Sequence, residues 1–494
     1  MNQGDLLVNR DGVHARKCQR AGRAGVRAPI VARKDRNGSG AKGVQEGGDV
    51  KSESMEEIPA AVPEEAKRVG EIRKRWNWVE PSVWTDRMLT ALEEGVKGGK
   101  WYSLMDKVYA LANLRSAFKK VKDRGGAPGV DRQTIEMFED HLEENLERLS
   151  QWLKEQKYRP QAIRRVWIPK GGGKEKRPLG IPTVRDRVVQ RALLHVLGPI
   201  FEREFAEHSY GFRPHRGCKD ALRQVAHLLR EGRLWVVDVD VRSYFDTIPH
   251  EPLMERVEER VADSRVLELL RAFLRQGVME TGNGWLPEEG TPQGAVISPL
   301  LANIYLNPLD HEINGRRGEM VRYADDFVLL CDSQAKAEGT LEQVGRWVEE
   351  AGLRLHLEKT RVVDATQPGG FDFLGYHFEQ GKRWPRRRSL RRLKDLIRAK
   401  TKRANGNSLP MIILKVNRTL TGWFGYFKHS HRTTFPPLDG WIRMRLRSIL
   451  RKRQHRKGCA RGRDHQRWPN AFFTEQGLFS LVTAHAQACQ SCER

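Results

Sequence analysis

The sequence predicts an α+β protein, because strand-like and helical segments are mixed in its middle part. Apolar runs of strand length lie at residues 165–169, 234–241 and 321–330. Residues 185–197 and 335–351 instead repeat apolar side chains at helical spacing. Segments of both kinds in one region are typical of the α+β class, and no internal repeat is visible.

The chain is strongly basic. Its 494 residues include 88 Lys and Arg against 63 Asp and Glu, a formal net charge of +25, and 39% are hydrophobic, which is enough for a folded core of two to four domains. Self-repulsion of this size is tolerated when an anionic partner neutralises it, and nucleic acid is the commonest such partner. The charge favours a nucleic-acid-binding protein over a basic ribosomal or membrane-surface protein.

Cysteine usage and hydropathy predict a cytoplasmic protein with no membrane span. The six cysteines are too scattered for a disulfide framework, and no apolar segment typical of a signal peptide follows the N-terminus. The longest uncharged run, residues 290–309, contains three prolines together with Gln293, Asn303 and Asn307, which a lipid-facing helix rarely holds. We therefore expect this run to be a loop that leads into a core helix.

Composition changes at both ends of the chain. Residues 1–75 are rich in Gly, Arg and Glu without apolar periodicity, which predicts a disordered arm; an organelle transit peptide is the alternative, and its acidic residues disfavour it. Helical spacing from Trp76 marks the start of the folded part. Residues 382–403 contain twelve Lys or Arg against one acid, and residues 443–463 contain ten with no acid. This C-terminal part is suited to bind phosphates.

Residues Tyr323–Ala324–Asp325–Asp326 interrupt two apolar runs and are predicted to form the tip of a β-hairpin. Placing two carboxylates between hydrophobic strands costs free energy through desolvation and repulsion, and a bound divalent cation is the usual way to offset that cost. Hard oxygen ligands in this setting suit Mg²⁺. The alternative is an Asp-rich turn that faces solvent.

A second pair of carboxylates lies in residues 234–241, where alternation places Asp238 and Asp240 on one face of an apolar strand. Two-metal phosphoryl transfer needs carboxylates from more than one segment, and a strand that ends at Asp240 beside the Asp325–Asp326 hairpin would supply them. Asp238 is interpreted as a strand-end or surface acid, and Asp246 as a structural acid at a helix start.

These segments resemble reverse transcriptases, which pair an aromatic-Ala-Asp-Asp turn with an upstream Asp followed five positions later by an aromatic residue. Here the upstream pair is Asp240 and Phe245. Further blocks follow the order of the family, at residues 126–131, 168–170, 177–182, 209–214, 291–300, 352–353, 358–360 and 373–376. The resemblance implies a right-hand polymerase with fingers at residues 76–231, a palm at 232–380 and a thumb from 381.

The resemblance also implies roles for single residues. Asp240, Asp325 and Asp326, with the backbone of Val241, would hold two Mg²⁺ ions, for which Mn²⁺ can substitute. Phe245 would lie under the sugar of the incoming nucleotide and reject a ribose 2′-hydroxyl; taken alone, it would be a core residue. The nucleotide would also contact Lys170, Arg177, Gln293 and Gly294, and the primer or template would contact Tyr323, Lys359 and Gly375.

Three features point to the group II intron members of this family. Residues 158–214 closely resemble those proteins, and the Pro-Gln-Gly form of residues 292–294 differs from the Ser-Gln pattern of diversity-generating enzymes. Residues 390–442 resemble their maturase thumb, and residues 468–481 resemble its tail. The resemblance implies an RNA-binding thumb at residues 381–460, and then a basic tail at residues 461–494 that is the remnant of a DNA-binding region.

The charges and aromatic residues of the thumb predict RNA contacts. Cationic helices neutralise phosphates, and aromatic rings stack on unpaired bases. For the two aromatic residues the alternative is a packed thumb core. The predicted RNA contacts are Arg387, Arg391, Lys394, Trp423, Tyr426 and a single helix face of Arg443, Arg447 and Arg451.

The resemblance implies an RNA-directed DNA polymerase encoded by a group II intron, which also binds its intron RNA to assist splicing and homing in a bacterial cytoplasm. Expected partners are the intron RNA, an RNA template with a DNA primer, target DNA at the nucleoid, and deoxynucleoside triphosphates. No His-Asn-His region follows residue 485, so we expect no second-strand cleavage, and Cys489 with Cys492 is too small a set for a zinc site.

Two alternatives stay open at this point. One is a reverse transcriptase outside any intron, of a CRISPR-linked or retron-like kind. The other is a splicing factor in which the polymerase core is unused. Clustered carboxylates disfavour the second alternative, because a scaffold has no need for groups that repel phosphate.

Overall fold

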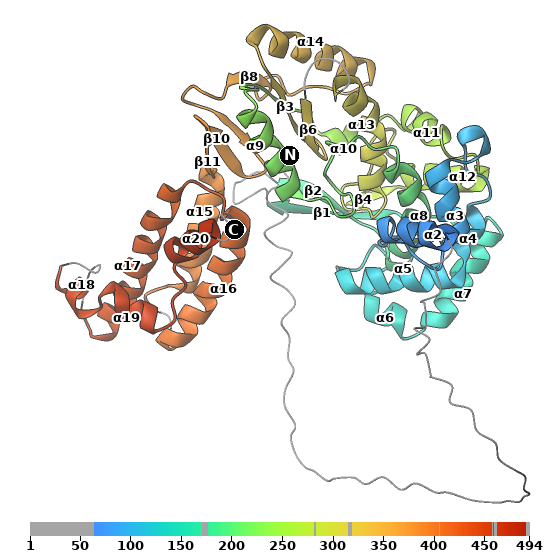
Figure 1. The fold of residues 1–494 in the computed structure, drawn as a ribbon. Helices are drawn as coiled ribbons and strands as arrows, with labels where there is room; N and C mark the ends of the chain where they lie inside the picture. The colour runs from blue at the N-terminus through green and yellow to red at the C-terminus, as the bar shows by residue number, and fades with distance from the viewer. Residues whose placement is uncertain are drawn as a thin grey trace, which may run out of the picture.

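A computed structural model describes residues 64–169, 176–280, 283–314, 319–404, 406–456, 458 and 462–490. Figure 1 shows a central sheet at the top, an N-terminal helical part at the lower right and a C-terminal helical part at the lower left. Helices and strands are mixed through the central part, so the predicted α+β class is confirmed. In the described residues no helix is long and apolar enough to cross a membrane.

The N-terminal part is a helical layer that packs around α8 (Val184–Glu202), which is almost entirely buried. Helix α5 (Leu111–Arg124) packs along α8, and the Trp84 indole nitrogen donates to the carbonyl of His195 at 2.9 Å. The remaining elements of this part are α2 (Glu64–Arg75), α3 (Asp86–Glu94), η1 (Lys97–Gly99), α4 (Met105–Tyr109), α6 (Ile135–Glu139) and α7 (Leu142–Lys154).

A small sheet extends from this layer toward the centre of the molecule. Its strand order is β2-β1-β4-β5, with β1 (Ile163–Pro169), β2 (Lys176–Ile181), β4 (Val278–Glu280) and β5 (Asn283–Trp285). Strands β1 and β4 pair in parallel through Ile163 and Val278. The predicted boundary between fingers and palm at residue 231 therefore does not separate the two sheets completely. Strands β4 and β5 follow this boundary in the sequence but belong to the sheet of β1 and β2, which precede it.

The central sheet has the order β6-β7-β3-β8, with β3 (Trp235–Asp240), β6 (Glu319–Tyr323), β7 (Asp326–Cys331) and β8 (Arg361–Asp364). Alternate side chains of β3 and β7 enter two different cores. Val237 and Phe327 join the core that continues into the N-terminal part, whereas Val236 and Val328 join the core that continues into the C-terminal part. The sheet thereby links the two halves of the molecule.

Helices cover both faces of the central sheet. Helices α13 (Ser298–Asn314) and α14 (Gln334–Glu350) pack on one face, and α9 (Cys218–Arg230) packs against β6 and β7 on the other. The predicted loop and core helix at residues 290–309 are confirmed, since α13 is buried along most of its length. Short helices α10 (Tyr244–Thr247), α11 (His250–Glu258) and α12 (Ser264–Leu274) connect β3 to β4.

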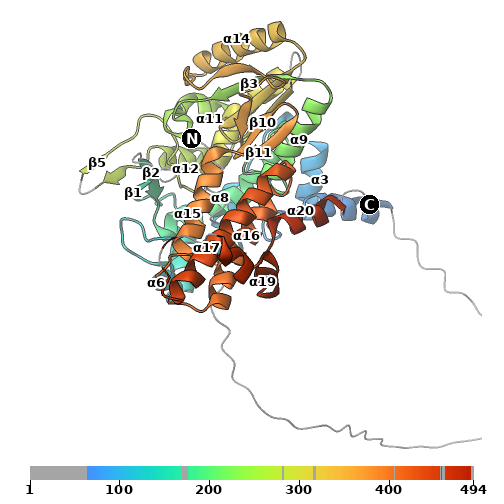
Figure 2. The same cartoon turned by 90° about the vertical axis from the view of Figure 1, so that its left-hand side faces the viewer.

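The C-terminal part begins with a three-stranded sheet, β9 (Phe371–Phe373), β10 (Tyr376–Glu379) and β11 (Lys382–Pro385), in the order β11-β10-β9. Its helices are α15 (Arg387–Lys400), α16 (Leu409–Phe427), α17 (Phe435–Arg453), α18 (Arg463–Arg467), α19 (Asn470–Glu475) and α20 (Leu481–Gln490), with the short turn η2 (Arg432–Thr434). Figure 2 shows α15, α16 and α17 grouped in one bundle below the sheet.

Two predicted boundaries are wrong. The predicted arm ends earlier than residue 75, because α2 spans Glu64–Arg75, and Ile72 of this helix packs against the core together with Trp76, which follows it. The predicted tail at residues 461–494 is a continuation of the bundle as far as residue 490, since Asp439 of α17 accepts from the backbone nitrogen of Leu481 at 3.1 Å. The arm up to residue 63 lies outside the described residues.

A buried ion pair joins the central sheet to α13. Arg322 of β6 donates through Nε to Asp310 Oδ1 at 2.7 Å and through Nη1 to Asn303 Oδ1 at 2.9 Å, and both charged side chains are fully buried. A buried charge is tolerated only when it is paired and hydrogen-bonded, so these polar residues fix how the helix lies against the sheet.

We expect Arg322→Met to lower the free energy of unfolding by about 3–5 kcal/mol, because it leaves the Asp310 carboxylate buried without a partner. Arg148→Ala, which breaks an exposed pair with Glu144, should cost under about 1 kcal/mol. Urea unfolding of the two variants measures both values. Equal small losses would show that the buried pair does not hold α13 in place.

Candidate active site

Three carboxylates meet where β3 ends and β7 begins. The antiparallel register places Asp240 directly opposite Asp326, and Asp325 occupies the preceding turn with only 6% of its surface exposed. Ala324 adopts a positive φ of 61°, which turns the chain sharply between β6 and β7. The predicted hairpin is therefore present, but its tip is buried, which excludes the solvent-facing Asp turn.

Hydrogen bonds from buried polar residues hold the backbone of the Asp325 turn, and the sequence analysis did not predict them. Arg322 Nη1 donates to the Ala324 carbonyl at 3.0 Å, and Asn303 Nδ2 donates to the Gly211 carbonyl at 2.8 Å. A Cβ on Gly211 would overlap the backbone nitrogen of Ala324, so glycine is required for this close approach. Asn303 and Asp310 were visible as polar residues in an apolar helical run, but their partners were not.

The carboxylates destabilise one another in their charged forms. Burial raises the pKa of Asp325 to about 6, with the Asp240 charge adding to the shift. Burial, and then the charges of Asp238 and Asp325, raise the pKa of Asp326 to about 8. Positive charge at this position would reverse both shifts, since it favours the ionised forms.

The donor set fits a divalent cation, although the side chains do not converge on one point. Among the described residues no group of three His, Cys, Asp or Glu is arranged to hold a metal ion. Lys359 Nζ instead lies 2.8 Å from Asp240 Oδ2. Mg²⁺ prefers carboxylate oxygens, and these lie together at the adjacent strand ends. The ion pair with Lys359 shows that one of these carboxylates already binds a cationic group.

Asp238 does not have the strand-end or surface position that we expected. It lies within β3, largely covered, with Arg361 Nε 3.7 Å from its Oδ2. Burial raises its pKa to about 7, against the lowering effect of Arg361. Because it shares a face of the strand with Asp240, it adds to the negative field of the site. Asp246 is confirmed near a helix start, where it accepts from Gln293 Nε2 at 3.2 Å.

Three of the predicted nucleotide contacts, Phe245, Gln293 and Gly294, lie in or beside α10. Phe245 is 9% exposed, and its carbonyl accepts from the Thr291 nitrogen at 2.6 Å. The Gly180 nitrogen donates to the Gln293 carbonyl at 2.7 Å, so the 292–294 loop is fixed to β2. Gly294 has φ 109°, and a Cβ there would overlap the Gly180 carbonyl. Arg177 is half-buried on β2, and Lys170 lies outside the described residues.

Two predicted contacts lie at the junction with the C-terminal part instead. Gly375 is buried in the turn between β9 and β10, where its carbonyl accepts from the Arg386 nitrogen at 3.0 Å. Tyr323 is buried beside the carboxylate turn. The backbone of Gly375 thus joins this sheet to α15, and a primer contact there stays a prediction.

Several predicted RNA contacts are instead engaged within the bundle, where Trp423 and Arg447 are buried and Tyr426, Arg443 and Arg451 are half-buried. Trp423 is buried with its ring 4.8 Å from Phe427, and the Tyr426 hydroxyl donates to the Leu374 carbonyl at 2.7 Å. The predicted arginine face of α17 is largely engaged by the protein itself: Arg447 is buried and donates to the Trp468 carbonyl at 2.8 Å, Arg451 pairs with Asp464 at 2.6 Å, and Arg443 lies 4.0 Å from Asp439.

Helix α15 presents the cations that stay available. Arg387 and Arg391 are exposed, with no ion pair to another described residue, and Lys394 lies 5.9 Å from the ring of Trp441. The helix carries a single acid, Asp395, which pairs with Arg398. This face suits a polyanion.

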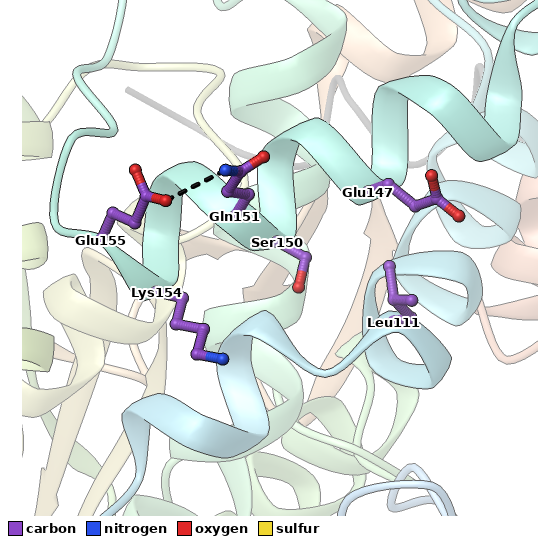
Figure 3. A pocket seen from close by; sticks show the side chains of 6 residues that line it. All are labelled: Leu111, Glu147, Ser150, Gln151, Lys154 and Glu155. Carbon is purple, nitrogen blue, oxygen red and sulfur yellow. Dashed lines mark hydrogen bonds between the residues drawn. The ribbon is translucent and has the colours of Figure 1, made fainter.

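A surface hollow of about 520 Å³ lies elsewhere, between α7 and the start of α5. Figure 3 shows its six lining residues, of which Gln151 and Glu155 are hydrogen-bonded to each other at 3.0 Å. None of the predicted catalytic or binding residues lines it. We assign it no part in the site.

Comparison with known proteins agrees with this geometry. Residues 168–378 match the family described as reverse transcriptase (RNA-dependent DNA polymerase), and residues 390–468 match the group II intron, maturase-specific domain. Protein YkfC of Escherichia coli is 39% identical over 290 residues, which cover 50% of this chain and 75% of YkfC. The group II intron-encoded protein LtrA of Lactococcus lactis is 40% identical over 299 residues, 47% of this chain and 49% of LtrA.

A chain in the solved structure described as a partial Cas6-RT-Cas1–Cas2 complex is 22% identical, with a TM-score of 0.34, and covers 50% of this chain and 42% of that chain. A score this low supports no conclusion, so the assignment rests on the sequence matches. A carboxylate turn inside a matched polymerase domain defines the class as reverse transcriptase. With the maturase-specific domain behind it, the chain belongs to the group II intron reverse transcriptase and maturase family, which confirms the predicted resemblance.

We expect Mg²⁺ or Mn²⁺ to stabilise the protein through these carboxylates, by about 2.7 kcal/mol at a hundredfold excess over the dissociation constant. Asp325→Asn and Asp326→Asn should lose most of this gain. Asp332→Asn, which removes an exposed acid paired with Lys336 just after β7, should keep it. Thermal unfolding at matched ionic strength measures the shifts, and an undiminished shift in Asp325→Asn would place the ion elsewhere.

Proposed function

We propose that this protein is an RNA-directed DNA polymerase encoded by a group II intron, and that it binds the intron RNA to assist splicing and homing. The observation that carries the polymerase role is the register that sets Asp240 against Asp326, with Asp325 in the adjoining turn. Proposed substrates are an RNA template with a DNA primer and deoxynucleoside triphosphates, and the proposed setting is the bacterial cytoplasm, with target DNA reached at the nucleoid.

Asp240, Asp325, Asp326 and the carbonyl of Val241 would hold two Mg²⁺ ions. When bound, such ions supply activation of the primer 3′-hydroxyl and neutralisation of the leaving pyrophosphate. The Asp240 side chain is 24% exposed, and its charge contributes to the raised pKa of Asp325, so it lies between solvent and the buried turn. Lys359 is close enough to the same oxygens to contact a primer phosphate.

The nucleotide would be positioned by residues around α10 and β2. Phe245 exposes only a small part of its ring, and its backbone is tied to the loop that carries Gln293 and Gly294, so it cannot retreat from a bulky sugar. Arg177, with Lys170, would neutralise the triphosphate. Phe245 would thus select the sugar by its shape, and Arg177 would bind the triphosphate by its charge.

Two alternative functions have weaker support. A splicing factor with an unused polymerase core leaves the clustered carboxylates without a purpose, since they repel phosphate and cost stability when buried. A reverse transcriptase outside introns leaves the match to the maturase-specific domain at residues 390–468 unexplained. Most of α15, including Arg391 and Lys394 of its basic face, lies within that match, which supports a role in binding RNA.

Primer extension on an RNA template tests the catalytic assignment. We expect Asp325→Asn to reduce the rate on the order of 1,000-fold or more, because several kcal/mol of transition-state stabilisation depend on the ions it would hold. Asp332→Asn should extend primers normally. Full activity in Asp325→Asn would remove this residue from the mechanism.

Sugar selection tests Phe245. We expect Phe245→Ala to reduce discrimination against ribonucleotides by roughly 10- to 200-fold, because the ring excludes the 2′-hydroxyl by contact. The ratio of kcat/KM for dNTP and rNTP with the same base measures the change. A lower kcat/KM for both nucleotides with an unchanged ratio would mean that Phe245 is a core residue alone.

RNA binding tests the proposed role of α15. We expect Arg387→Ala and Arg391→Ala each to weaken binding of the intron RNA and to reduce the slope of log affinity against log salt by about 1, as for the loss of one phosphate contact. Arg275→Ala removes an exposed arginine that directly follows α12 and pairs with Glu251, and should leave the slope unchanged. Unchanged slopes in all three variants would move the RNA surface away from α15.

A further inference from the structure

Phe212 is an exposed aromatic residue beside the carboxylate turn. It is 44% exposed, and its ring centroid lies 6.5 Å from that of Tyr323, two residues before Asp325. Its backbone has φ 59°, a conformation that is strained for a bulky residue. An exposed ring on a strained backbone contributes little to the stability of the fold. Stability therefore does not explain why an aromatic residue lies at this position.

The backbone on both sides of Phe212 is fixed. Before it, Gly211 lies against Ala324 and its carbonyl accepts from Asn303, which also accepts from Arg322. After it, Arg213 is buried and donates to the Ser209 carbonyl at 2.8 Å and to Glu202 at 3.0 Å. The ring is therefore held outward on a rigid base that also carries the catalytic turn.

The substrate group next to this turn follows from the chemistry. The carboxylates must lie at the primer 3′-hydroxyl, and nucleotides follow one another about every 3.4 Å along a strand. A ring one side chain away from the turn can therefore be reached by the last one or two primer nucleotides. Phe212 carries no charge, so it would meet a sugar or a base edge and not a phosphate.

We propose that Phe212 is a positioning residue that packs against the 3′-terminal nucleotides of the primer and holds the terminus over the carboxylates. This inference rests on the proposed polymerase function and names the strand that the turn meets. Truncating an aromatic contact to nucleic acid weakens binding by about 5- to 100-fold. Phe212→Ala is expected to raise the KM for template–primer within that range, with the KM for dNTP unchanged, and Phe212→Trp is expected to restore it.

Stability separates this role from a structural one. Phe212→Gly relieves the positive φ, so its thermal midpoint should equal or exceed that of the wild type while the KM for template–primer rises. A ring that served only to support the turn would give a lower midpoint in Phe212→Gly and in Phe212→Ala. That result would overturn the proposal.

Photo-crosslinking locates the contact without any catalytic step. The variant Phe212→p-benzoylphenylalanine, in the full chain with an RNA template and DNA primer and no dNTP, should crosslink to the last two primer nucleotides. Tyr102→p-benzoylphenylalanine, which alters a 64% exposed ring of the N-terminal part, should not. Crosslinks to the template strand alone, or none, would overturn the proposal. A primer crosslink in a protein that extends no primer would instead count against the proposed function.

Discussion

The register between β3 and β7 is the constraint on which the active site depends. Because side chains alternate along a strand, a slip of one residue would send Asp240 into the core that Val239 occupies and remove it from Asp326. The same register sends apolar residues of both strands into the two cores of the molecule. The strand pairing that folds the sheet therefore also brings Asp240 and Asp326 together.

Holding acidic residues together in this sheet costs stability, and the surrounding structure is arranged to bear that cost. Arg322 lies beneath the turn, paired with Asp310 and bonded to the Ala324 carbonyl. Lys359 lies beside Asp240 at the open side. The buried cation fixes the backbone of the turn, whereas the exposed one can move away when substrate or metal arrives. The buried Arg322 thus keeps the turn rigid, and the exposed Lys359 can change its position.

The sequence was sufficient for the parts of the site that depend on local pattern. Alternation predicted the strand that ends at Asp240, and apolar flanks predicted the hairpin at Asp325 and Asp326. Helical periodicity did not separate the two faces of α17, because an arginine face looks the same whether it meets RNA or, as for Arg447, the carbonyl of Trp468. The link between Gly211, Asn303 and Arg322 joins three segments far apart in the chain, and no local pattern carries that information.

The most direct test of the account is splicing of a precursor RNA transcribed from the DNA around the gene, at low magnesium, with and without the purified protein. We expect splicing that depends on the protein, because the polymerase and the RNA-binding bundle would serve one intron. Absence of any effect on splicing, in a preparation that extends primers on RNA, would contradict the maturase role and leave a reverse transcriptase with a different RNA partner.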